Sequence, residues 1–431
     1  MSLKTIRNIV LFAAFFILAF GAGYQVGVEK GTDRNFSDLS ISSEKITGKT
    51  SEKISSLDFS LFWDVWDRLN KSYLDKKALN PEKMFYGAIS GMVASLGDPY
   101  TVFLSPDQNK EAKDDLGGKF EGIGAQLGIK DKKIVVVAPL KDTPAEKAGL
   151  MPGDWIVKVD GKDTANWTLP EAVSKIRGPK GSKVVLTIVK KEASSSAEIT
   201  VIRDSIKVAS VEWEMLNVDC SHLLSECRII KEVCPECYKV VYLKLIRFGD
   251  QTPEEWNKAV DEIILKTKEE EKKNKMKGLV FDLRNNPGGY LSGSVFIASE
   301  FLKDGVVVTQ ENASGIKQTY SVNRKGKFTE MPLVVLINKG TASSSEIVAG
   351  ALQVRRGIKT VGETSFGKGS IQEAQDLEKG AGLHITTAKW LLPNGKWING
   401  SGIEPDLKVE NDPNKPDEDL QLIKGIEVLV K

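Results

Sequence analysis

The sequence is poor in histidine: only His222 and His384 occur among its 431 residues. This scarcity limits the hydrolytic mechanisms open to the protein, because histidine is the usual general base beside a nucleophilic serine. His384 lies in the strand-like run GLHITTAKW with no Asp or Glu next to it, as a packed strand residue would. A Ser-His-Asp triad is therefore poorly supported.

The chain also lacks a strong charge of either sign. Its 60 basic and 58 acidic residues leave a net charge of +2, and no basic stretch is interleaved with aromatic residues. Binding to nucleic acid depends on a concentrated positive surface, so we expect no nucleic-acid partner. A hydrophobic content of 41% and a charged content of 27% are ordinary for folded protein, and the length allows two or three domains.

One apolar run stands out, at the N-terminus. Lys4 and Arg7 precede an unbroken apolar stretch, Ile9 to Ala22, which is the layout of a secretory signal or a signal-anchor. Cleavage after Gly21 is the alternative, but the absence of a clear A-x-A site favours a retained transmembrane anchor over residues 1–28. Because basic residues before an anchor stay in the cytoplasm, we expect a single-pass membrane protein whose remaining residues are extracytoplasmic.

Two segments separate this anchor from the rest of the chain. Residues 29–56 are polar and without periodicity, which is typical of a linker. Residues 57–112 contain two amphipathic patterns, LDFSLFWDVWDRLNKSYL and NPEKMFYGAISGMVASL, which predict two helices, the second with Pro81 in its first turn. The stretch GDPYTVFLSP that follows is expected to be a loop.

Residues 117–204 are rich in short β-like runs. KKIVVVAPL, DWIVKVDG and SKVVLTIVKK predict strands, and TPAEKAGL and TLPEAVSKIRG predict short helices. This segment resembles a PDZ domain through GIGAQLGI and TPAEKAGLMPGDWIVKVDG. The resemblance implies binding of an extended chain end, with the backbone N–H groups of the loop holding its carboxylate. The implied loop residues are Gly122, Ile123, Gly124 and Ala125. A small β-barrel without a ligand is the alternative.

Residues 211–238 contain every cysteine of the chain, at positions Cys220, Cys227, Cys234 and Cys237. Four neighbouring cysteines outside the cytoplasm most often form two disulfides. A zinc site is the alternative, with His222 able to replace one thiolate, although the paired CxxC spacing of zinc knuckles is missing. The segment is expected to be a structural insert in either case.

Residues 239–410 alternate strand-like and helix-like patterns. The strand-like runs include YKVVYLKLIRF, KGLVFDL and MPLVVLIN, and a long charged helix is expected between Pro253 and Lys273. Alternation of this kind indicates an α/β catalytic layer. Residues 411–431 end in DLQLIKGIEVLVK, which predicts a terminal helix.

The run TASSSEIVAGAL raises the question of a nucleophile. Ser343 followed by Glu346 matches a capping box, which is far more common than a catalytic serine. A serine at a strand-to-helix turn also lies beside the unpaired N–H groups and positive dipole of the helix, a setting that can hold an oxyanion. The glycines of DLRNNPGG, Gly288 and Gly289, can bring a further backbone N–H close.

Lysine is the remaining candidate base. Lys368, in GETSFGKGS, would have to be neutral when it acts, which requires burial. The same stretch nearly matches a phosphate-binding loop, but Gly369 occupies the position that requires Ser or Thr for Mg²⁺. We therefore expect neither a nucleotide nor any other cofactor.

Taken together, these motifs resemble the carboxyl-terminal processing proteases, also called tail-specific proteases. The resemblance runs from about Leu61 to Asp406 and includes GDPYTVFLSP, the PDZ pattern, DLRNNPGGYL, NKGTASSSEIVAGALQ, VGETSFGKGSIQ and LLPNGKWINGSGIEPD. It implies a serine endopeptidase that recognises the C-terminal tails of protein substrates through its PDZ domain. A homo-oligomer is a further candidate assembly.

The resemblance also assigns roles to single residues. Ser343 corresponds to the nucleophile, Lys368 to the general base and acid, and Gln372 to the residue that positions the lysine. The backbone N–H groups of Gly288 and Ser344 correspond to the oxyanion hole, where serine at Ser344 departs from the common SASASE run. The four-cysteine insert is a second departure.

Two expectations remain open beside these assignments. Arg177, at the end of a short PDZ helix, either complements the helix dipole, senses the bound chain end or docks the PDZ domain on the core. The competing function is a membrane-anchored PDZ scaffold with an inactive protease core.

Overall fold

The computed structural model describes residues 58–130, 133–140, 142–190, 196–220, 227–232, 234–273, 275–412, 415 and 418–430. The anchor expected at residues 1–28, the linker and His222 lie outside these residues. Within the described ranges no helix combines the length and the apolar character needed to cross a membrane. The chain divides into two compact units, residues 1–92 and 93–431.

The first unit contains the two expected helices. Helix α2 spans Ser60–Ser72 and α3 begins at Pro81 and runs to Ala94, with a short 3-10 turn, η3 (Lys76–Ala78), between them. On α2 the side chain of Trp66 is buried, whereas Leu61 and Val65 on the same apolar face are largely exposed. Tertiary burial of this unit within the described residues is therefore slight.

The expectation of a plain loop over GDPYTVFLSP is wrong. Strand β1 (Val102–Leu104) lies within it, and helix α4 (Pro106–Leu116) follows directly. The strand exists because it pairs antiparallel with β19 (Gly382–Leu391), far away in sequence. Helix α4 begins after Ser105, whose N–H donates to Gln108 Oε1 at 3.0 Å, and its sequence is too polar to show helical periodicity.

The PDZ segment forms two small sheets and two helices. Its elements are β2 (Lys119–Gly122), β3 (Ala125–Lys130), β4 (Lys133–Pro139), α5 (Pro144–Lys147), β5 (Trp155–Val159), β6 (Lys162–Asp163), α6 (Leu169–Ile176), β7 (Lys183–Val189), β8 (Ser196–Ile202) and β9 (Asp204–Lys207). The larger sheet has the order β3-β4-β5-β7-β8, with β6 paired to β5, and β2 pairs with β9. Inward-facing residues such as Ile134, Val136 and Ile156 form its own hydrophobic core.

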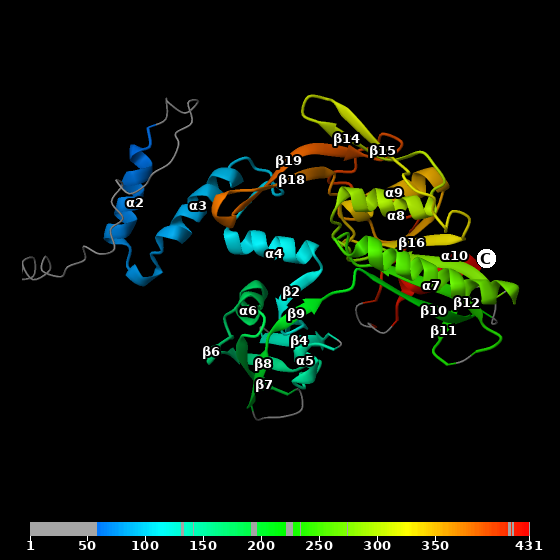
Figure 1. Ribbon diagram of the computed structural model, residues 1–431, viewed down its shortest axis with the longest axis horizontal. Coiled ribbons are helices and arrows are strands. Elements are labelled where there is room, and N and C mark those ends of the chain that lie inside the picture. Colours follow the sequence, from blue (N-terminus) through cyan, green and yellow to red (C-terminus); the bar gives the residue numbers. More distant parts are fainter. Residues whose placement is uncertain are drawn as a thin grey trace, which may run out of the picture. The chain divides into compact units, whose positions relative to one another are not determined.

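The core is built on a seven-stranded sheet with the order β11-β10-β12-β13-β16-β17-β20. Its strands are β10 (Val211–Asp219), β11 (Arg228–Ile230), β12 (Tyr238–Leu245), β13 (Met276–Asp282), β16 (Leu333–Ile337), β17 (Lys359–Gly362) and β20 (Leu407–Lys408). Strands β10, β11, β12 and β16 of this sheet are labelled in Figure 1. The strands from β12 to β20 run parallel to one another, whereas β10 pairs antiparallel with both β12 and β11. This confirms the α/β architecture expected for the core.

Helices cover both faces of this sheet. Alternate residues of the central strands, such as Leu279 and Phe281, face α7 (Thr252–Lys272), α8 (Leu291–Phe301) and α9 (Ser344–Arg356). The residues between them, such as Val280, face α10 (Leu420–Val430). The period of two along a strand explains why parallel strands buried on both sides are continuously apolar.

A second sheet of five strands lies beside α9. It consists of β14 (Val306–Asn312), β15 (Lys317–Ser321), β18 (Ser370–Asp376), β19 and β1 in the order β1-β19-β14-β15, with β18 also paired to β19. A short 3-10 turn, η4 (Glu378–Gly380), joins β18 to β19. This sheet carries Gln372 and His384 on neighbouring strands.

The cysteine segment is smaller than expected. Residues 211–219 form strand β10 of the main sheet, so the insert proper begins at Cys220. Disulfides join Cys220 to Cys227 and Cys234 to Cys237. Sulfurs bonded in this way are not thiolate ligands for zinc, and the described residues contain no group of three or more His, Cys, Asp or Glu suited to a metal ion.

Candidate active site

Ser343 occupies the turn between β16 and α9 in a strained conformation. Its φ is +55° and its ψ is −118°. An ordinary N-cap residue has an extended backbone, and a positive φ is uncommon in residues other than glycine. Backbone strain of this kind persists only where the surroundings impose it and is concentrated at functional sites. The conformation therefore distinguishes Ser343 from a serine that merely caps a helix.

The turn is fixed to the loop that follows β13. The turn of residues 341–345, here called the serine turn, donates four hydrogen bonds to carbonyl groups of residues 283–289, here called the glycine loop. The bonds are Thr341 Oγ1 to Leu283 O (2.8 Å), Ala342 N to Asn286 O (3.0 Å), Ser345 Oγ to Asn286 O (3.0 Å) and Ser344 Oγ to Gly289 O (2.9 Å). The three residues Thr341, Ser344 and Ser345 are almost completely buried. The serine turn and the glycine loop therefore form one rigid unit.

Gly288 lies against Ser343, as expected of an oxyanion-hole residue. A Cβ atom at Gly288 would come within 2.8 Å of Ser343 Cβ and 3.0 Å of Ser344 N, and its φ is +97°. Only glycine allows this approach. The N–H of Ser344 is the first in helix α9 and has no acceptor within the helix.

The Gly288 N–H predicted for the oxyanion hole has a hydrogen-bond partner within its own loop. The N–H of Gly288 donates to Asn286 Oδ1 at 2.9 Å, and the Asn286 amide in turn donates to Leu245 O at 2.7 Å. Asn286 is completely buried. In this structure the Gly288 donor is therefore engaged within its own loop, which sequence motifs could not reveal.

Glu346 is the residue that connects the serine to the lysine. Its carboxylate accepts hydrogen bonds from Ser343 N (2.8 Å), Ser365 Oγ (2.6 Å), Gly367 N (2.6 Å) and Lys368 N (2.9 Å). It is fully buried, and this burial raises the pKa of the carboxyl group, while the four donors oppose the rise. The sequence marked Glu346 only as the partner in a capping box, which accounts for one of its four bonds.

Lys368 has the electrostatic setting that a catalytic lysine requires. Burial lowers the pKa of its amine, and the nearby carboxylates of Asp98 and Glu346 partly offset that effect. Its Nζ lies 4.9 Å from the centroid of the Tyr100 ring. Asp98 and Tyr100 belong to the GDPYT motif. This motif contributes to the family resemblance and could have pointed to the site, but its pattern assigned no role to either residue.

Ser343 and Lys368, the pair that the sequence predicts to be catalytic, are not hydrogen-bonded to each other in this structure. Within the described part of the chain no hydrogen bond joins Ser343 Oγ to Lys368 Nζ, although their backbones share the Glu346 carboxylate. Gln372, on β18, donates to Ser370 Oγ at 2.9 Å and Thr386 Oγ1 at 3.0 Å instead of to the lysine. The three residues come to one region, but the dyad and its positioning contact are not formed.

His384 is a packed residue of strand β19. It is paired with Val102 of β1, and both burial and the charge of Lys368 lower the pKa of its imidazole. These features agree with the expectation that it does not act as the catalytic base.

The carboxylate-binding loop of the PDZ domain connects β2 to β3. Gly124 has a φ of +77°, and a Cβ atom there would lie 2.5 Å from Thr143 Cβ, so this position requires glycine. The carbonyls of Ile123 and Gly124 accept from Ala145 N and Leu140 N, at 2.8 and 2.9 Å. These bonds fix the loop at the base of helix α5.

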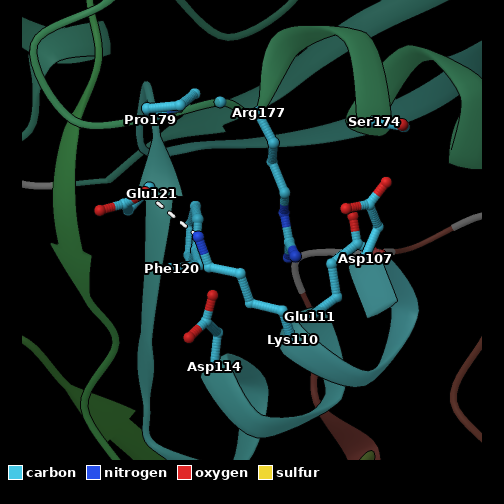
Figure 2. Close-up of a pocket in the computed structure, with 10 residues that line it drawn as sticks. Asp107, Lys110, Glu111, Asp114, Phe120, Glu121, Ser174, Arg177 and Pro179 are labelled. Atoms are coloured by element: carbon cyan, nitrogen blue, oxygen red, sulfur yellow. Dashed lines mark ion pairs between the residues drawn. The ribbon is translucent and has the colours of Figure 1, made fainter. Parts of the chain in front are cut away.

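Arg177 lies next to this loop and points toward helix α4 (Figure 2). Its guanidinium stacks 4.8 Å from the centroid of the Phe120 ring and lies 3.4 Å from Asp115 Oδ1. The cavity around it measures about 300 Å³ and is lined on the α4 side by acidic residues that include Asp107, Glu111 and Asp114. Arg177 therefore links the end of α6 to the helix that precedes the PDZ domain.

A second hollow of about 380 Å³ adjoins the glycine loop. Its lining includes Leu116, Ile246, Phe248 and Pro287 together with Gly288. Asp115, Arg247 and Asn285 also line it, so the hollow combines apolar and polar walls.

Comparisons with known proteins give the family. The model of peptidase family S41 matches residues 239–409, a PDZ-domain model matches 135–190, and the model of the N-terminal domain of the activating protease CtpB matches 18–108. The carboxy-terminal processing protease CtpA of Bacillus subtilis is 36% identical over 374 residues, which is 85% of this chain and 73% of the relative.

Further relatives agree. A carboxy-terminal-processing protease of Bartonella bacilliformis is 36% identical and matches 81% of this chain and 74% of its own. A solved S41 protease structure from Bacteroides fragilis is similar with a TM-score of 0.50 and 17% identity, over 84% of this chain and 94% of that one, which bears on the fold alone. This chain belongs to the carboxy-terminal processing proteases, serine peptidases of family S41 that combine a PDZ domain with an α/β core.

Proposed function

We propose that this protein cleaves other proteins after recognising their C-terminal tails, and that a dyad of Ser343 and Lys368 performs the cleavage. The observation that carries the proposal is the shared carboxylate of Glu346, which holds the backbones of both residues. The strained φ of Ser343 and the burial of Lys368 support it further.

The chemistry follows from these groups. Neutral Lys368 takes the proton of Ser343, and the alkoxide attacks the peptide carbonyl to form a tetrahedral intermediate. Lys368 then protonates the leaving amine, and the acyl group on Ser343 is released by a water molecule that the neutral amine activates. The N–H of Ser344 stabilises the oxyanion, joined by that of Gly288 once it leaves Asn286.

Substrate binding assembles the reactive arrangement. In the part of the chain that the structure describes, no hydrogen bond joins the Ser343 hydroxyl to the Lys368 amine, and Gln372 donates to Ser370 and Thr386. We infer that a bound tail brings Lys368 within reach of Ser343 and lets Gln372 position the amine without adding charge. A site that is complete only when occupied protects other proteins from cleavage.

The PDZ domain supplies the selectivity for chain ends. The loop from Gly122 to Ala125 offers backbone N–H groups to a terminal carboxylate, and β3 offers its edge to the rest of the tail. Arg177 lies beside that loop and is bonded to Asp115 of α4. Arg177 is therefore suited to couple the binding of a negatively charged chain end to helix α4.

We also propose that the protein is anchored in a bacterial membrane by residues 1–28 with its catalytic part extracytoplasmic, and that it assembles as a homo-oligomer. The basic residues before the apolar run and the two disulfides support this location. Protease added to spheroplasts should digest the core, and light scattering in detergent should give a multiple of the chain mass. Protection from the protease, or a monomer mass, would contradict these two claims.

The dyad is tested by comparing the full chain in detergent with Ser343→Ala and Lys368→Ala on an unfolded protein that ends in a small apolar tail. Both variants should lose at least ~10³-fold in turnover, since each removes a group that acts in every transition state. Lys396→Ala, an exposed lysine, is the matched control and should cleave like the wild type. Products are identified by mass spectrometry.

Two results would contradict the proposal. Retained cleavage by pure Ser343→Ala would exclude it as the nucleophile, and wild-type binding of the tail with no cleavage under any condition would favour the scaffold function. A substrate with an amidated C-terminus should be cleaved more slowly, because the PDZ loop then has no carboxylate to hold.

The pH dependence of kcat/KM tests the lysine. Activity should rise with pH as Lys368 loses its proton, with a midpoint below the usual lysine pKa of about 10.4 because burial disfavours the charged amine. Asp98→Asn removes a carboxylate that raises this pKa, so the midpoint should move to lower pH. Asp304→Asn, at an exposed site, is the control. A midpoint that stays in place or rises in Asp98→Asn would contradict the assignment.

A further inference from the structure

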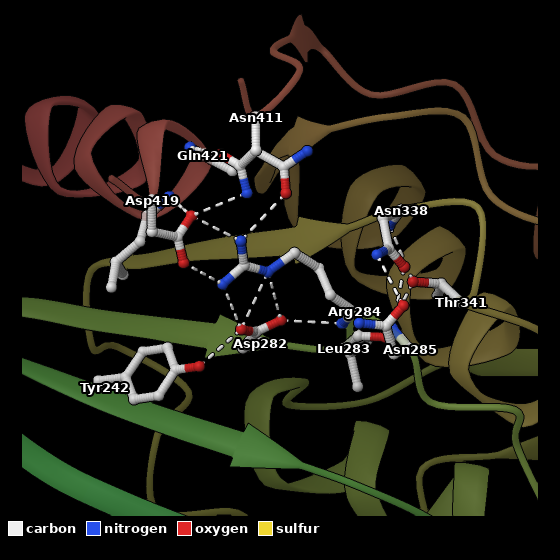
Figure 3. A network of polar contacts seen from close by, with 11 residues as sticks. Tyr242, Asp282, Leu283, Arg284, Asn285, Asn338, Thr341, Asn411, Asp419 and Gln421 are labelled. Carbon is white, nitrogen blue, oxygen red and sulfur yellow. Dashed lines mark hydrogen bonds and ion pairs between the residues drawn. The ribbon is translucent and has the colours of Figure 1, made fainter. Parts of the chain in front are cut away.

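Arg284 lies in the loop after β13 and is held between two carboxylates (Figure 3). On one side its Nε and Nη2 donate to Asp282 at 3.0 and 2.7 Å. On the other side its Nη1 and Nη2 donate to the two oxygens of Asp419 at 2.7 and 2.8 Å. The Arg284 side chain is only 10% exposed and that of Asp282 2%, whereas that of Asp419 is 37% exposed. The paired, charge-assisted bonds are therefore shielded from water on the Asp282 side and partly open to it on the Asp419 side.

Arg284 belongs to the glycine loop of the candidate active site. Arg284 is two residues before Asn286, whose side chain holds the N–H of Gly288, and four before Gly288 itself. The neighbouring Asn285 has a φ of +58°, so the chain turns sharply directly after the arginine. Fixing the guanidinium therefore fixes the direction in which the glycine loop leaves strand β13.

Asp419 comes from a distant part of the chain. It precedes helix α10, and its Oδ1 also accepts from Leu422 N at 3.0 Å, so it caps that helix. The helix packs on the face of the sheet opposite to α9. Asp419 lies beyond residue 409, where the match to the peptidase family model ends. In the sequence it is only the first residue of the pattern DLQLIKGIEVLVK, which predicts the terminal helix.

The electrostatics of the pair are consistent with a permanent ion pair. Burial raises the pKa of Asp419, but the hydrogen bonds and charge of Arg284 outweigh it, so the pKa is lowered. On the other side, Tyr242 Oη donates to Asp282 Oδ2 at 2.7 Å, and Gln421 Oε1 accepts from Arg284 at 3.0 Å. Arg284 is thus hydrogen-bonded to residues of both β13 and the start of α10.

We propose that Asp419 is a positioning residue for the oxyanion-stabilising loop. Through Arg284 it ties the C-terminal helix to the loop that contains Asn286 and Gly288. This inference rests on the proposed function, since it assumes that Gly288 stabilises the oxyanion. Asp419 touches neither substrate nor the dyad, so its contribution should appear in the transition state and not in the binding of the tail.

Asp419→Asn is the sharpest test in the full chain. Asparagine caps a helix about as well as aspartate, so α10 should remain folded, whereas the charge opposite Arg284 is lost. We expect kcat to fall roughly 10-fold, with KM and tail-peptide affinity unchanged. The affinity for a peptidyl boronate, which mimics the tetrahedral intermediate, should fall with kcat. Asp419→Glu should recover part of the loss.

Glu427→Gln is the matched control on the same helix. Glu427 pairs with Lys424 at 3.0 Å and makes no contact with Arg284, so kcat should stay at the wild-type value. A folded Asp419→Asn protein with wild-type kcat and boronate affinity would overturn the inference. An equal loss in Glu427→Gln would also overturn it, because the helix as a whole would then be responsible.

Hydrogen exchange separates this inference from the proposed function. The amides of residues 286–290 should exchange faster in Asp419→Asn than in the wild type or in Glu427→Gln, whether or not the protein cleaves the chosen substrate. Unchanged exchange in this loop would refute the positioning role, whereas an inactive wild type with the expected exchange pattern would count against the proposed function alone.

Discussion

The buried carboxylate of Glu346 is the interaction on which the catalytic region depends. A charged group without exposure to water is tolerated only where hydrogen-bond donors surround it. The Glu346 carboxylate accepts three bonds from the loop of residues 363–369, here called the lysine loop: two from backbone N–H groups and one from a hydroxyl. It accepts a fourth from the N–H of Ser343 in the serine turn. Neither loop can move without leaving one of these bonds unmade. The carboxylate that caps the start of α9 thus also joins the turn of Ser343 to the loop of Lys368.

The sheet explains why these loops meet. Strands β13, β16 and β17 are adjacent and parallel, so the loops after their carboxyl ends converge at one edge, where α/β proteins place their sites. The glycine loop, the serine turn and the lysine loop are those three loops. On the opposite face α10 reaches the same edge through Asp419 and Arg284, so both helical layers are bonded to the loops at this edge.

Sequence reasoning predicted most helices and strands and the candidate residues, but not the hydrogen bonds that join the loops. Local patterns predicted α9 and the buried strands because their apolar periodicity is strong, and motifs predicted Ser343 and Lys368. The short strand β1 was missed because it is stabilised by a partner some 280 residues away, and polar α4 because it has no apolar stripe. The bonds of Glu346, Asn286 and Asp419 depend on tertiary placement, which no local pattern encodes.

The most direct test of this account is Glu346→Gln in the full chain, measured by the rate at which a fluorophosphonate labels the active serine. The amide would present N–H groups to donors that now meet a carboxylate, so labelling should slow by at least roughly 10-fold. The protein should unfold at a lower temperature than the wild type but remain folded at the assay temperature, with tail-peptide binding close to wild type. Glu378→Gln, at an exposed site, should label normally. Labelling of folded Glu346→Gln at the wild-type rate would contradict the claim that this carboxylate assembles the site.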